Sequence, residues 1–280
     1  MTEPELLLGH SPDPDDAFMF YALAREKIPT GPWRFRHILE DIQTLNERAR
    51  RAELHISALS FHAYPYVADR YALLGCGASM GENYGPMVVA RHPMKLDELR
   101  GRRIAVPGET TTAFLVLNLI LGKSAFSHEV VPFDRIVERV AEGRFDAGLI
   151  IHEAQLTYQQ KGLHCVADLG RWWFEDTGLP LPLGGIVSRR DLGPEAMRQI
   201  AGIVRASIEY GLAHRGEAVE YALEYARGMG AELADRFVGM YVNRWTLDLG
   251  ETGRQAVGVL LERGQEAGLV PACGAIEFVT

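Results

Sequence analysis

The chain alternates short apolar runs with helix-like stretches, and this alternation limits the folds open to it. Apolar runs at residues 6–9, 35–39 and 54–59 are typical of buried strands. Helix-like stretches begin near Asp13, where acids and a proline fill a first turn, and at Ile42. This strand–helix–strand–helix–strand order predicts a mostly parallel sheet with helices on its faces.

The pattern restarts after residue 93 and changes towards the C-terminus. We expect strands at 103–106, 128–131 and 147–151, and helices at 111–121 and 134–142. From Pro194 onward the chain is nearly all helix, with apolar residues at three-to-four spacing on one face: Met197, Ile200, Val204, Ile208 and Leu212.

Two such units, joined near residues 87–93 and 184–188, indicate that one domain is inserted into another. We expect an α/β fold of two lobes. Residues 1–90 and 187–280 would form the larger lobe with the C-terminal helices, and residues 91–186 the smaller lobe. A cleft between lobes is a common ligand site, and a hinge there would allow closure around a ligand.

The composition is that of an ordinary globular protein and argues against a nucleic-acid partner. Lys and Arg number 29 against 37 Asp and Glu, so the net charge is −8. Binding to a phosphate backbone needs a basic face instead. Hydrophobic residues make up 47% and charged residues 24% of the chain, which excludes the disordered and fibrous classes.

The cysteines and the N-terminus favour a cytoplasmic protein. Cys76, Cys165 and Cys273 lie far apart and form neither a disulfide framework nor a CxxC metal motif. The first residues lack the basic stretch and apolar core of a secretory signal. The apolar runs are shorter than the ~20 residues that span a bilayer, so we expect no membrane association.

In an open α/β sheet, ligands bind beyond the carboxyl ends of the strands. That rule selects polar residues after each predicted strand: His10, Ser11, Asp13, Asp15, Glu40, Asp41, Ser60, His62, Gly108 to Thr112, Asp134, His152 and Glu153.

Thr111 and Thr112 lie where a turn leads into a helix. Unpaired amide groups and hydroxyls at a helix N-terminus suit a carboxylate or phosphate, although threonine is also an ordinary helix cap. No Walker or Rossmann glycine motif accompanies them, which disfavours nucleotide binding.

His152 directly follows a predicted apolar strand. Imidazole titrates near neutrality and is the commonest general base, so this position makes His152 a candidate catalytic residue. The alternative is a structural histidine whose ring is satisfied by packing.

The sequence predicts no metal site. The nine histidines are scattered, and no HExxH motif or closely spaced Cys/His set occurs. Asp13, Asp15 and Asp16 could together bind a cation, but acids in a first helical turn are also stabilised by the helix dipole.

Six sequence blocks, in order over about residues 6 to 190, carry a resemblance to a known family. They are SPDPDDAF at 11–18, DIQTLN at 41–46, LSFHA at 59–63, GRRIAVPG at 101–108 with TTA at 111–113, LIIHE at 149–153, and GLPLPLGG at 178–185. Together they resemble the 1,4-dihydroxy-6-naphthoate synthases of the futalosine route to menaquinone. The chain departs from that family's usual pattern at Asp13, Asp15 and Ala17, where cysteine, asparagine and threonine are common.

This resemblance implies a two-lobed, type II periplasmic-binding-protein-like fold that works as a cytoplasmic, cofactor-independent lyase. The implied substrate is the small molecule cyclic dehypoxanthine futalosine, cleaved to 1,4-dihydroxy-6-naphthoate. By the same resemblance His152 is the catalytic base. The implied substrate-binding residues, with the strand-end positions Ser11 and Asp41, are Ser57, Ala58, Leu59, Ser60, Thr111 and Thr112.

Three other functions fit parts of the pattern. The chorismate dehydratases of the same pathway would share the fold, but the opening block and His152 speak against them. A solute-binding protein for a small anion would share the cleft and the threonine site, yet would normally carry a signal or lipid anchor. A ligand-sensing regulator would need a DNA-binding element, and the sequence shows no such motif.

Overall fold

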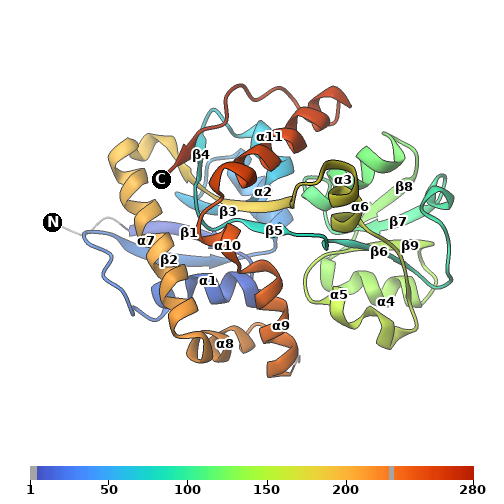
Figure 1. Ribbon diagram of the computed structural model, residues 1–280, viewed down its shortest axis with the longest axis horizontal. Coiled ribbons are helices and arrows are strands. Elements are labelled where there is room, and N and C mark those ends of the chain that lie inside the picture. The colour runs from blue at the N-terminus through green and yellow to red at the C-terminus, as the bar shows by residue number, and fades with distance from the viewer. Residues whose placement is uncertain (1–4, 227–229) are drawn as a thin grey trace.

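The computed structural model describes residues 5–226 and 230–280, and in these residues two separate β-sheets lie side by side (Figure 1). The seven-stranded sheet has the order β12-β4-β11-β3-β1-β2, with β5 also paired to β11. Its strands are β1 (Glu5–His10), β2 (Arg34–Leu39), β3 (Ile56–Ser60), β4 (Tyr71–Leu74), β5 (Ser79–Gly81), β11 (Leu181–Arg189) and β12 (Phe278–Val279).

The five-stranded sheet has the order β10-β6-β9-β7-β8. Its strands are β6 (Met87–Ala90), β7 (Arg103–Val106), β8 (Ser127–Val130), β9 (Ala147–Ile150) and β10 (His164–Asp168). The chain passes from the first sheet to the second between β5 and β6, and it returns through β11 (Figure 1).

Helices cover both sheets. The α-helices are α1 (Pro14–Ala24), α2 (Ile42–Arg50), α3 (Thr112–Leu121), α4 (Ile136–Ala141), α5 (Ala154–Thr157), α6 (Leu169–Thr177), α7 (Pro194–Ala213), α8 (Arg215–Leu223), α9 (Ala231–Tyr241), α10 (Arg244–Leu247) and α11 (Gly250–Glu266). Short 3-10 helices are η1 (Phe61–Tyr66), η2 (Leu96–Leu99), η3 (Phe133–Arg135), η4 (Tyr158–Lys161) and η5 (Arg190–Leu192).

The predicted strand–helix alternation is confirmed, but the sheets are mixed rather than mostly parallel. β1 pairs in parallel with β2 and β3, and β7 with β8 and β9. β11, in contrast, runs antiparallel to β3, β4 and β5, and β6 runs antiparallel to β9 and β10. Both β6 and β11 lie in the connecting segments, where the sequence analysis expected crossovers and no strands.

The chain passes from one sheet to the other close to the predicted domain boundaries. β6 ends at Ala90 and pairs in the five-stranded sheet, although residues up to 90 were expected in the first lobe. β11 begins at Leu181 and pairs in the seven-stranded sheet, ahead of the expected return at residue 187. The division into lobes at residues 90 and 187 stays a prediction.

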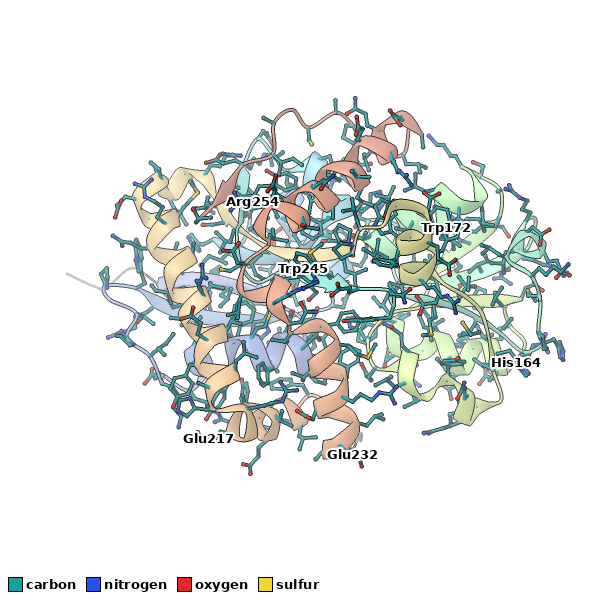
Figure 2. The ribbon with its side chains drawn as sticks, in the orientation of Figure 1. His164, Trp172, Glu217, Glu232, Trp245 and Arg254 are labelled. Atoms are coloured by element: carbon teal, nitrogen blue, oxygen red, sulfur yellow. The ribbon has the colours of Figure 1, made fainter. Side chains whose placement is uncertain are left out.

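The C-terminal helices return to the seven-stranded sheet. α7 and α8 pack against α1, and β12 pairs with β4. Because α1 has the sheet on one side and α7 on the other, its residues from Pro14 to Leu23 are all buried. In Figure 2, Glu217 of α8 and Glu232 of α9 lie at the outer edge, whereas Trp245 of α10 is buried.

Among the described residues, every helix is too short or too polar to cross a bilayer.

Candidate active site

A cavity of about 110 Å³ lies where the ends of strands from both sheets meet. Its wall is built by the segments that follow β1, β3 and β9, by the start of α3, by the middle of β11 and by α9. The lining residues include Ser11, Asp13, Asp15, Asp16, Ala58, Leu59, Ser60, Thr111, Thr112, Ala113, His152, Gln155, Gly184, Phe237 and Tyr241. Of the residues that the strand-end rule selected, the cavity lining contains Ser11, Asp13, Asp15, Ser60, Thr111, Thr112 and His152. It does not contain His10, Glu40, Asp41, His62, Gly108, Glu109, Thr110, Asp134 or Glu153. Whether the cavity residues bind substrate stays a prediction.

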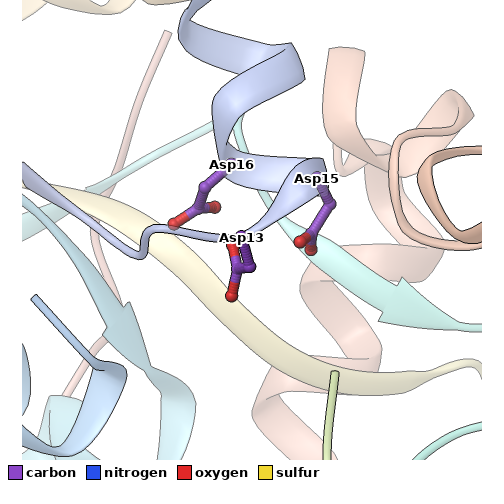
Figure 3. A group of neighbouring side chains, drawn as sticks. All are labelled: Asp13, Asp15 and Asp16. Atoms are coloured by element: carbon purple, nitrogen blue, oxygen red, sulfur yellow. The ribbon is translucent and has the colours of Figure 1, made fainter. Parts of the chain in front are cut away.

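Three aspartates gather at the start of α1 (Figure 3). Asp13 is the N-cap residue in extended backbone conformation, Pro14 occupies the first turn, and Asp15 and Asp16 follow. Asp16 Oδ2 accepts a hydrogen bond from the Ser11 amide at 2.7 Å. The short loop between β1 and α1 thus turns three buried carboxyl groups towards one another.

His152 lies directly opposite this group. Its Nδ1 is 2.8 Å from Asp13 Oδ2, and the two side chains are only 12% and 3% exposed. The ring of Phe133 packs on the imidazole with 4.4 Å between ring centroids. The backbone of His152 has a φ of +63°, in the left-handed region that non-glycine residues seldom adopt. Such strain persists only where the surroundings hold it, and it is concentrated at functional sites.

Burial governs the charge of the aspartates. It raises the pKa of Asp15 well above its usual range, and the charges of Asp13 and Asp16 and a hydrogen bond with Asp13 raise it further. Burial, followed by the charge of Asp13, raises the pKa of Asp16 to about 8. Burial and mutual repulsion therefore disfavour three negative charges in the cavity.

The same three aspartates are the group whose spacing could suit a metal ion, with ligand oxygens within 4.8 Å of one another. Asp16 already accepts a hydrogen bond from the Ser11 amide, and Asp13 is paired with His152. The helix dipole also stabilises acids at this helix start. We assign no metal here, and the expected absence of a metal stays a prediction.

The segment at the end of β3 presents three of its four predicted residues to the cavity. Ala58, Leu59 and Ser60 line it. Ser57 does not, because its hydroxyl is fully buried and donates to the Ala58 carbonyl at 2.8 Å. Across the sheet, Gly184 of β11 pairs with Ser60, and a Cβ there would lie 3.1 Å from the Leu59 carbonyl oxygen.

Thr111 and Thr112 line the cavity, but their hydroxyl protons are used within the protein. The Thr111 hydroxyl donates to the Gly108 carbonyl at 2.8 Å and caps α3 by accepting from the Phe114 amide. The Thr112 hydroxyl donates to the Leu183 carbonyl at 2.6 Å. A ligand would therefore meet mainly the first amide groups of α3, which have no partner within the helix.

Asp41 is not brought to the cavity. It is the N-cap of α2, and its carboxylate accepts hydrogen bonds from the amide and the hydroxyl of Thr44 at 3.1 and 2.5 Å. Asp41 follows a strand, but it also immediately precedes α2, and its carboxylate caps that helix instead of reaching the cavity.

The sequence pattern did not predict several residues in or behind the cavity wall. Asn46 of α2 lies behind the wall and bridges the Ser60 hydroxyl and the Thr110 carbonyl, at 3.0 and 3.2 Å from its Nδ2. Tyr241 of α9 donates to Gln155 Oε1 at 2.8 Å, and Phe237 lies one turn earlier. The only local signal for these two aromatics was their spacing on one helix face, which equally predicts ordinary core packing.

Comparison with known proteins decides the family. A model of the menaquinone biosynthesis family matches residues 6–266. The chain belongs to this family. The resemblance expected from the six sequence blocks is thereby confirmed.

Two relatives of this menaquinone biosynthesis protein bear the name 1,4-dihydroxy-6-naphtoate synthase. That of Thermus thermophilus is 45% identical over 264 residues, covering 94% of this chain and 95% of the relative. That of Streptomyces coelicolor is 42% identical over 278 residues, covering 98% of each chain. Both names imply an enzyme that acts on a small molecule.

Solved structures confirm the expected fold. A protein of Archaeoglobus fulgidus superposes with a TM-score of 0.90 at 44% identity, covering 95% of this chain and 98% of that one. The alkanesulfonate-binding protein of Xanthomonas axonopodis gives 0.72 at 13% identity, covering 99% and 98%. A Candida albicans protein described as having the generic periplasmic binding protein fold gives 0.70 at 13% identity, covering 94% and 95%. The menaquinone biosynthesis protein therefore has a periplasmic-binding-protein-like α/β fold.

Proposed function

We propose that the protein converts cyclic dehypoxanthine futalosine into 1,4-dihydroxy-6-naphthoate as a carbon–carbon lyase that needs no cofactor. The names of the two relatives support the product. The observation that carries the chemistry is the imidazole of His152, held by Asp13 at the wall of a buried cavity.

In the proposed reaction, His152 removes the proton of a hydroxyl group on the sugar-derived portion of the substrate. That carbon–oxygen bond becomes a carbonyl as the adjacent carbon–carbon bond breaks in a retro-aldol sense, so the sugar-derived fragment leaves as a carbonyl compound. The electron pair of the broken bond passes to the ring portion, which takes up the proton from His152. Formation of the aromatic naphthalenediol drives this step. Bond cleavage of this kind requires a positioned base, and histidine is the residue most often used.

The two ends of the substrate would be held by different elements. The amide groups at the start of α3 suit an anionic group, since they carry the positive end of the helix dipole. At the other side, the Ser60 hydroxyl accepts from Asn46, so its proton can be donated to the substrate beside the glycines of β11.

A product assay tests this proposal. Purified protein without added metal or cofactor is incubated with cyclic dehypoxanthine futalosine, and 1,4-dihydroxy-6-naphthoate is followed by chromatography. We expect product from the wild type and a loss of at least roughly 100-fold in kcat for His152→Ala, the usual size of a general-base contribution.

His128→Ala is the matched control, because His128 also pairs with a carboxylate, Glu109 at 2.9 Å, but lies outside the cavity. We expect it to keep wild-type activity. If a folded His152→Ala protein kept wild-type turnover, His152 would not be the catalytic base. No product from a wild-type protein that binds the substrate would favour a binding protein instead.

A further inference from the structure

The contacts of the His152 ring fix its orientation. A ring at the end of a strand can rotate about two side-chain bonds, and an imidazole works as a base only when the correct nitrogen carries the lone pair. Here the ring contacts the tilted ring of Phe133, and its Nδ1 lies against Asp13. The left-handed backbone of His152 sets the direction in which the side chain leaves the main chain.

We propose that Asp13 is a positioning residue for His152, whose carboxylate accepts the Nδ1 proton of the neutral imidazole and so leaves the lone pair on Nε2. When Nε2 takes a proton from the substrate, the same carboxylate stabilises the imidazolium that forms. This inference rests on the proposed function, in which His152 is the base. The arrangement follows the logic of the aspartate in a Ser-His-Asp triad.

Charge within the cavity singles out Asp13 among the three aspartates. Burial and the charge of Asp13 raise the pKa of both Asp15 and Asp16, which disfavours a negative charge on those two groups. Asp13 is the aspartate whose oxygen lies 2.8 Å from a nitrogen of His152 that can become cationic. The geometry therefore makes Asp13 the partner of His152.

Two other ionisable groups near this pair carry no charge at pH 7. Burial lowers the pKa of His10 to about 3 and raises that of Tyr241 well above its usual range, so both are neutral. Glu153 follows His152 in the chain, and Asp16 also interacts electrostatically with His152.

The test combines imidazole nitrogen NMR with kinetics on Asp13→Asn and Asp13→Ala. In wild-type protein labelled with ¹⁵N-histidine, we expect His152 to be protonated at Nδ1 and not at Nε2 in its neutral form. Both substitutions should change this tautomer balance. They should also lower kcat by roughly 100-fold or more and change KM much less, because the lost interaction is strongest when the imidazole becomes cationic during the reaction.

The pH profile separates orientation from a general loss of structure. Without the counter-charge the imidazolium is less stable, so the acid limb of the kcat profile should move to lower pH in Asp13→Asn. Glu109→Gln is the matched control: it removes the carboxylate partner of His128 and should move neither the His152 signals nor kcat.

Two results would overturn the inference. One is a wild-type His152 protonated at Nε2, which can be measured even if neither variant folds. The other is unchanged His152 signals and kcat in folded Asp13 variants. If the NMR pattern depends on Asp13 but the wild type forms no product, the pairing stands and the proposed reaction fails.

Discussion

At the scale of single residues, two histidines next to the site are held neutral by burial. His10 is 1% exposed, and its Nε2 lies 2.9 Å from His37 Nδ1. Burial, helped by the neighbouring ring, lowers the pKa of His10 to about 3, and burial lowers that of His37 to about 4. Between two neutral rings one nitrogen donates and the other accepts, whereas two protonated rings would repel each other.

This pair predicts a loss of stability in acid. The unfolded chain takes up protons on these histidines below pH 6.5, while the folded chain does so only near pH 3 to 4. The free energy of unfolding attributable to the pair is therefore fully present above pH 6.5 and falls as the pH falls, by up to ~1.4 kcal/mol per pH unit for each histidine.

His37→Gln should reduce the pH dependence of the free energy of unfolding, by up to the contribution of one histidine proton. Urea unfolding of wild type and variant at pH 7, 6 and 5 measures it. Comparing the two proteins removes the opposite contribution of Asp16, whose raised pKa favours the folded state as the pH falls from 8. Parallel curves for the two proteins would contradict the prediction.

At the scale of elements, α2 joins the two sheets at the cavity. Asn46 is fully buried and bonds both to Ser60 at the end of β3 and to Thr110 before α3. Gln43, one turn earlier, accepts from the Thr110 amide at 3.1 Å and from its hydroxyl at 2.8 Å. One helix thus sets the distance between the serine segment and the start of α3.

Asn46→Ala should therefore impair both stability and binding. Removing the side-chain amide leaves its buried partners unsatisfied, at a cost of ~1–3 kcal/mol in unfolding free energy. We also expect KM to rise several-fold, because Ser60 and Thr110 would no longer be held by the same side chain. Asn118→Ala is the control, since this buried side chain bonds only within α3, to the Phe114 carbonyl. A stability loss in both variants with KM unchanged in both would show that the bridge does not shape the site.

At the scale of the whole molecule, the cavity is too small for the proposed substrate as it stands. Its volume is about 110 Å³, below the ~150 Å³ of an engineered cavity that holds one benzene ring. A substrate with a fused ring system and a sugar-derived part would extend beyond this volume, so we expect the two halves to separate when it binds. We expect the contacts of α2 with Thr110 to open in that movement.

A cross-link between these halves should stop turnover. A Cβ built on Gly108 lies 2.7 Å from the Gln43 Cβ, which is closer than the ~3.8 Å of a disulfide. Cysteines at both positions would therefore need the two segments to move apart by about 1 Å before they could form a cross-link. We expect Gln43→Cys/Gly108→Cys to lose most activity when oxidised and to regain it with a reductant. Either single variant is the control for the substitutions themselves, and equal activity in the oxidised and reduced double variant would mean that opening is not required.

Much of this molecule is determined locally by its sequence. The apolar runs and helix starts predicted β1 to β3 and β7 to β9 with their helices, since period and capping depend only on neighbouring residues. The rule that ligands bind beyond strand ends then selected Ser60, Thr111 and His152, all of which line one cavity. Family-specific blocks added the expected fold and activity class.

Only the tertiary structure decided which polar groups meet. β6 is short, and β11 lies in a stretch that contains proline and glycine. Both form strands because β9 and β3, which lie far away in the sequence, pair with their backbones. Asp41 and Asp13 both open helices, yet one carboxylate caps its helix and the other reaches His152. The local sequence offers the same side chain in both places; what differs is the packing of the two sheets, which brings a histidine to one of them.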